Sequence, residues 1–223
     1  MSFTVVEYIR EDGSNPYREG FDGLDPQAAA KVAAAIVRLE IGNTSRLKSI
    51  GTIGECRIDW GPATVSGEGS KRFDRPVRWR HQERPNWRYT AGREIVCGVQ
   101  EAQNCSCKVQ RLEVVDTALT RDFRTTVVER VQRDPAFAKA LIDEAATLFL
   151  NGEPVTARLI LRDLVNATVG FEGLAAETAK PAQSLHRMLT DKGNPSMDNI
   201  AAIFKVVRKN LGLAFEAHTV KAA

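Results

Sequence analysis

The polar side chains best suited to a chemical role form a short run near the C-terminus. Glutamine and arginine can make paired hydrogen bonds to the edges of adenine and guanine, and a serine near a helix N-terminus can hold a phosphate. These residue types in one short segment therefore predict contact with DNA. The candidate DNA-binding residues are Gln183, Ser184, His186 and Arg187, with Lys180 and Lys192 as phosphate contacts.

Two short helices are expected to position these side chains. The sequence predicts helices over residues 171–178 and 182–189, joined by a turn. This spacing is typical of a helix-turn-helix, whose second helix enters the major groove of DNA. It also fits an αα-hairpin in a helical bundle with solvated polar side chains, and the spacing alone leaves both interpretations open. The residues expected to pack the two helices together are Leu174, Ala175, Leu185 and Leu189.

The rest of the C-terminal half is predicted to be almost entirely helical. Asp134-Pro135 and Glu153-Pro154 are start signals, because proline is favoured in the first turn of a helix. Ser196 is a third candidate cap. The expected helices span 135–148, 154–164 and 197–211, and residues 213–217 are a candidate terminal strand.

The C-terminal half resembles a known family. Residues 117–223 are similar to the HigA-like antitoxins, the bacterial addiction module antidotes, and the motifs that carry the likeness are Phe149-Leu150-Asn151-Gly152-Glu153, Ser184-Leu185-His186-Arg187-Met188-Leu189 and Gly193-Asn194-Pro195-Ser196-Met197-Asp198-Asn199. The resemblance implies a lambda-repressor-like helix-turn-helix domain. It also implies a homodimer that represses its own operon and neutralises a RelE- or HigB-like toxin. Pro181 departs from the pattern, since the family commonly has a small polar residue there.

The N-terminal part is predicted to mix strands and helices. Residues 3–8 and 53–60 have the composition of strands, and Asn15-Pro16 is a helix start. Residues 28–39 are rich in alanine, with larger apolar residues at spacings of four and three that form one helix face. Lys48 lies in an expected loop between this helix and the second strand. The segment is therefore expected to be α+β.

Residues 3–62 resemble the toxins of the RelE/ParE superfamily, the addiction module killer proteins. The matching stretches are Asn15–Phe21, Arg38–Asn43 and Cys56–Pro62. These toxins are ribosome-dependent mRNA endonucleases, so the resemblance implies that Arg57 and Lys48 are candidate catalytic residues that stabilise charge on RNA. Solvated surface charge is the alternative, favoured for Lys48. A surviving endonuclease is the alternative function of the chain, weakened because the likeness stops near residue 62.

Residues 63–115 fit neither a helical nor an alternating pattern. Between Lys71 and Arg93 eight basic residues stand against two acidic ones, and Trp79 and Trp87 lie among them. Such a run could bind single-stranded nucleic acid. In a shifted reading frame, however, Phe73–Gln82 permits Leu-Ile-Val-Leu-Phe-Gly-Gly-Gly-Thr-Lys, close to the continuation of the toxin family. We therefore interpret 63–115 as a frameshifted linker.

Composition bounds the remaining possibilities. The 223 residues are 43% apolar and 26% charged, with 31 basic and 28 acidic side chains giving a net charge of only +3. No apolar run of membrane-spanning length occurs, and the N-terminus lacks a basic region leading into an apolar one, so a cytoplasmic protein is expected. Cys97, Cys105 and Cys107 lack the paired spacing of a zinc site, so neither a metal nor a cofactor is expected.

Together these features predict a mainly α protein with three parts. Residues 1–62 are a truncated α+β fragment of RelE/ParE type, 63–115 are the irregular linker, and 116–223 are the helix-turn-helix antitoxin domain. A poorly folded product that neither binds DNA nor cleaves RNA is a third possibility. It predicts that proteolysis leaves no protected fragment beginning near residue 117.

The frameshift interpretation makes a prediction about the gene. We expect the nucleotide sequence across codons 60–118 to encode the toxin-like continuation in a shifted frame and to rejoin the antitoxin frame near its end. Sequencing of the locus checks this. An intact toxin frame with its own stop codon would contradict the interpretation.

Overall fold

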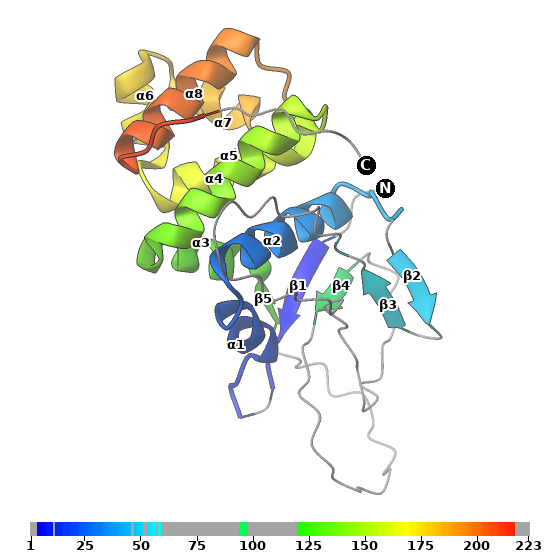
Figure 1. The fold of residues 1–223 in the computed structure, drawn as a ribbon. Coiled ribbons are helices and arrows are strands. Elements are labelled where there is room, and N and C mark those ends of the chain that lie inside the picture. The colour runs from blue at the N-terminus through cyan, green and yellow to red at the C-terminus, as the bar shows by residue number, and fades with distance from the viewer. Residues whose placement is uncertain are drawn as a thin grey trace, which may run out of the picture. The chain divides into compact units, whose positions relative to one another are not determined.

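The chain is mainly helical and forms two compact units. The computed structural model describes residues 4–10, 12–45, 47–50, 53–56, 58, 94–97 and 120–216, and these contain eight helices and five strands (Figure 1). One unit, the sheet unit, comprises Met1–Gly23 and Arg38–Phe123. The other, the helical unit, comprises Leu24–Val37 and Arg124–Ala223.

In the sheet unit, β1 (Thr4–Tyr8) is the central strand. It pairs in parallel with β4 (Glu94–Cys97) and antiparallel with β5 (Thr120–Asp122). The helix α1 (Pro16–Asp22) begins at Asn15, whose side-chain oxygen accepts a hydrogen bond from the Arg18 amide at 2.9 Å. The amide group of the same asparagine donates to Glu7, a fully buried residue of β1. One residue thus caps the helix and joins it to the sheet.

A second pair of strands corrects the sequence prediction around Lys48. Strands β2 (Leu47–Ile50) and β3 (Ile53–Cys56) pair antiparallel, with Lys48 opposite Glu55. Lys48 therefore lies in a strand and not in the expected loop. The facing strand supplies its backbone partners, and a run of only four residues does not predict such pairing from the sequence. Arg57 lies outside the described residues.

The helical unit contains most of the helical residues. Two of its helices begin where the sequence predicts, at Pro135 and at Met197. Asp134 accepts hydrogen bonds from the amides of Ala136 and Phe137 at 3.1 and 3.2 Å, and Ser196 accepts from the Asn199 amide at 3.4 Å. The elements are α2 (Pro26–Glu40, with its last three residues in the sheet unit), α3 (Phe123–Arg133, with Phe123 in the sheet unit), α4 (Pro135–Leu150), α5 (Pro154–Ala167), α6 (Gly170–Thr178), α7 (Ala182–Met188) and α8 (Met197–Asn210).

The helix α3 was not predicted from the sequence. Phe123, Val127 and Val131 recur at a spacing of four and are buried, but Thr126 and Arg130 are buried as well. These two polar residues interrupt the apolar periodicity from which a helix is predicted in a sequence.

One apolar core joins α4 to α8. The helices α4 and α5 pack side by side, and α6 packs against α5, α7 and α8 (Figure 1). Burial of so many large side chains is the main source of stability in such a unit. The largest fully buried side chains of these helices and of the residue after α7 are Phe137, Leu141, Ile142, Ile160, Leu161, Leu164, Leu174, Leu185, Leu189 and Ile203.

The expected terminal strand is wrong over its described part. Leu213–Glu216 follows α8 without strand structure. The ring of Phe215 lies edge-on to Phe204 of α8 at 5.7 Å between centroids, and Phe204 in turn meets Phe149 of α4 at 6.5 Å. The aromatic contacts hold this segment against the helices, so no strand partner is required.

Two further predictions concern parts of the chain that the structure describes incompletely. Within the predicted linker, 63–115, only β4 is described. The domain limits at 62 and 116 stay predictions, although Leu24–Val37 groups with the helices that follow residue 124.

Among the described residues, none of the helices is both long and apolar enough to cross a membrane.

Arg124→Ala is expected to destabilise the helical unit by about 3 kcal/mol, because Asp163 loses the charge that compensates its burial. Arg124 of α3 donates to both carboxylate oxygens of Asp163 at 2.8 Å, and Asp163 is 3% exposed. Lys209→Ala is the control, since Lys209 pairs with Glu177 at 2.9 Å but is well exposed, and should cost less than about 1 kcal/mol. Urea unfolding measures the loss of unfolding free energy in both variants. Equal losses would contradict the stabilising role of the buried Arg124–Asp163 pair.

Candidate nucleic-acid interface

Five of the six predicted DNA-binding residues lie on a hairpin of two helices, Gly170–Met188, here called the α6–α7 hairpin. The chain reverses at Ala179, which has φ 52° and ψ 36°, the left-handed conformation. An alanine there costs roughly 1–2 kcal/mol relative to a right-handed residue. Pro181 follows in extended conformation, with φ −60° and ψ 134°, and directs the chain into α7. The tertiary packing must therefore hold the turn.

Leucines provide that packing. Leu174 of α6, Leu185 of α7 and Leu189 just after α7 are all fully buried. Their burial confirms three of the four predicted packing positions, and Ala175 is half-buried. Because Leu185 and Leu189 are one helical turn apart, they fix which side of α7 faces the core.

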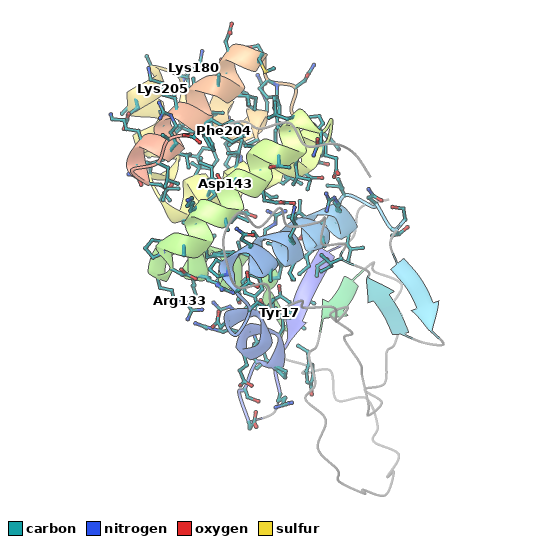
Figure 2. The ribbon with its side chains drawn as sticks, in the orientation of Figure 1. Tyr17, Arg133, Asp143, Lys180, Phe204 and Lys205 are labelled. Carbon is teal, nitrogen blue, oxygen red and sulfur yellow. The ribbon has the colours of Figure 1, made fainter. Side chains whose placement is uncertain are left out.

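The opposite side of α7 is polar and open. Gln183, His186 and Arg187 are exposed, and Ser184 is half-buried. Lys180, labelled in Figure 2, lies half-buried in the turn before α7, and Lys192 is exposed in the loop after it. The structure thus brings all six predicted DNA-binding residues onto the hairpin and its flanking loop.

His186 has two neighbours that sequence reasoning missed. Its ring lies 4.9 Å from that of Phe171, between centroids, and its Nε2 atom is 3.5 Å from Nη2 of Arg162 on α5. A guanidinium can only donate, so Arg162 is the donor in this contact. No local pattern links Arg162 to a residue on another helix, so only the fold could reveal the contact.

The loop after α7 is held by a buried arginine. Arg158 of α5 is 7% exposed, and its guanidinium donates to the carbonyl oxygens of Thr190 and Asp191 at 3.5 and 3.3 Å. Burial lowers the pKa of Arg158, and the nearby charge of Asp191 opposes this shift. An arginine stays charged even so. Arg158 therefore fixes the backbone next to Lys192.

A glycine completes the same loop. A Cβ atom added at Gly193 would lie 2.3 Å from the carbonyl oxygen of Met188 and 2.7 Å from that of Arg187. Backbone atoms cannot yield to such a contact without moving the end of α7. Gly193 therefore allows the loop to pass directly beneath the helix that carries the candidate DNA-binding residues.

The candidate catalytic residues of the N-terminal part are not brought together by anything described. The backbone of Lys48 lies in β2, and Arg57 is outside the described residues. Their catalytic role stays a prediction. In the part of the chain that the structure describes, no three His, Cys, Asp or Glu side chains are grouped to hold a metal ion.

The chemistry open to the α6–α7 hairpin is hydrogen bonding by exposed donors and attraction of anions. Glu172 and Glu177 on the hairpin and Asp191 in the loop after it are also exposed, so this surface has both signs of charge. No family model, no curated protein and no solved structure matches this chain. The function is therefore inferred from the residues of the chain and their arrangement.

Gly193→Ala should lower the free energy of unfolding by about 2 kcal/mol, because the added methyl group meets backbone oxygens. Gly173→Ala is the matched control in α6, where a Cβ would meet only the Val169 Cβ at 3.6 Å, an ordinary contact. That change should stabilise the protein by about 1 kcal/mol through helix propensity. Thermal unfolding followed by circular dichroism compares the two. A loss of stability in both variants, or in neither, would refute the close approach of Gly193 to the backbone at the end of α7.

Proposed function

We propose that the chain is the antitoxin of a type II toxin–antitoxin module, fused to a remnant of a toxin. It binds operator DNA as a sequence-specific autorepressor and neutralises a RelE-like toxin. The observation that carries the proposal is α7, which buries Leu185 on one side and exposes Gln183 and Arg187 on the other. The fold proposed is a lambda-repressor-like helix-turn-helix domain that follows a truncated RelE/ParE-like fragment.

In this proposal α7 is the recognition helix. Gln183 and Arg187 are four residues apart, so they project from the same side of the helix on successive turns. Seven residues of helix are roughly 10 Å long, a length that fits a major groove about 12 Å wide. Gln183 and Arg187 can then reach neighbouring base edges, with His186 beside them.

The proposed phosphate contacts are made by Lys180, Lys192 and Ser184. Lys180 and Lys192 lie on either side of α7 in sequence, where they can contact phosphates and set the position of the helix on the duplex. Ser184 is less accessible and is assigned a phosphate contact too. Such contacts add affinity at any DNA sequence and make binding sensitive to salt.

The partners proposed for the chain come from the resemblance of residues 117–223 to the HigA-like antitoxins. A homodimer would place two copies of α7 one helical turn of DNA apart, at roughly 34 Å, on a palindromic operator. The second partner is a RelE- or HigB-like toxin. The proposed location is the cytoplasm.

Arg187→Ala is expected to weaken binding to the promoter of the chain's own operon by about 10- to 100-fold, because a paired contact to a guanine is lost. Lys205→Ala is the control, an exposed lysine on α8 that has no part in the proposed contacts. Gel shifts with the full chain at fixed salt measure both. Unchanged binding by the Arg187 variant, or an equal loss with Lys205→Ala, would count against α7 as the recognition helix.

A further inference from the structure

The helical unit includes a helix from a distant part of the sequence. Leu24–Val37, most of α2, belongs to this unit together with the residues from 124 onward. Between residues 28 and 37 every side chain except Lys31 is buried, with an exposed fraction of 7% or less. A helix on a protein surface keeps a polar stripe toward water. This part of α2 has no such stripe.

An ion pair joins α2 to α4. The Nζ atom of Lys31 contacts Oε2 of Glu144, a residue that is 6% exposed. Glu144 lies next to Ala145 and three residues after Leu141, both fully buried or nearly so, on the apolar side of its helix. A carboxylate in such surroundings is costly unless a cation compensates it. Here the cation comes from α2.

A second buried charge depends on the same segment. Arg130 of α3 is 4% exposed, and its Nη2 atom donates to the carbonyl oxygen of Leu24 at 2.6 Å. Its guanidinium also lies 4.7 Å from the ring centre of Phe137, and its Nε atom is 3.5 Å from Asp134. Two neighbouring helices thus each direct a buried charged group at the segment from Leu24 to Lys31.

We propose that α3 and α4 form a helix-binding surface, and that α2 is its built-in occupant. The occupant is an alanine-rich helix. Its Lys31 is aimed at Glu144, and the carbonyl group of Leu24, which precedes its first turn, is aimed at Arg130. The surface therefore fits the same kind of helix from a second polypeptide. In the intact chain α2 excludes that helix. The inference uses none of the DNA-binding residues.

A charge exchange in the full-length chain tests the proposal. The probe is a fluorescent synthetic peptide with the sequence of residues 24–40, and fluorescence anisotropy measures its binding. Lys31→Glu places two carboxylates against each other, so α2 should leave the surface, while Glu144 remains available to the lysine of the peptide. The double variant Lys31→Glu/Glu144→Lys restores opposite charges and should keep its own α2 in place.

We expect the peptide to bind Lys31→Glu at least tenfold more tightly than it binds the wild-type chain or the double variant. A peptide that itself carries Lys31→Glu should not bind the Lys31→Glu chain. Equal binding to wild type and Lys31→Glu would overturn the proposal, because the surface would not be occupied. Binding to neither, with Lys31→Glu folded by circular dichroism, would overturn it too.

Thermal stability, measured by melting from a lower starting temperature, decides the question if Lys31→Glu is partly unfolded at the temperature of the binding assay. We then expect the double variant to recover at least half of the melting temperature lost in the two single variants, since the exchanged pair interacts again. Additive losses would show that Lys31 and Glu144 do not meet, and would overturn the proposal.

Discussion

The burial of α5 is the constraint on which the helical unit depends. Ten of its fourteen residues are buried, so this helix has almost no side that faces water. Two of the buried residues, Arg158 and Asp163, are charged. Each is compensated by a different part of the unit, Asp163 by Arg124 of α3 and Arg158 by carbonyl groups after α7. Hydrophobic burial thus assembles the unit, and the two charges fix its arrangement.

The helix α5 also fixes the position of the candidate DNA-binding surface. Leu174, Leu185 and Leu189 seat the α6–α7 hairpin, and Arg158 holds the loop that follows it. Arg162, on the more exposed side of α5, reaches His186. The exposed side chains of α7 therefore stand on a rigid support although α7 itself has only seven residues. A short helix with an alanine in a left-handed turn would not hold this form alone.

Local signals predicted much of the helical unit. Asp134 and Ser196 cap helices as expected, and the spacing of Leu174, Leu185 and Leu189 predicted which sides of two helices are buried. Prediction was wrong where a distant partner decides the structure. Lys48 lies in a strand because Glu55 and its neighbours pair with it, and Phe215 packs against Phe204 in place of forming a strand. The DNA-binding role of α7 stays a proposal.

The sequence by itself determined where α4, α5 and α8 begin, which of their positions are apolar and which polar residues share the exposed side of α7, because caps and periodicity act over a few residues. Only the tertiary structure decided the partners of the buried charges. Glu144 meets Lys31 and Asp163 meets Arg124, and both pairs join residues remote in the chain. A charged residue in a sequence looks the same whether water or another charge compensates it. The packing of helices removes the water and thereby selects the partner.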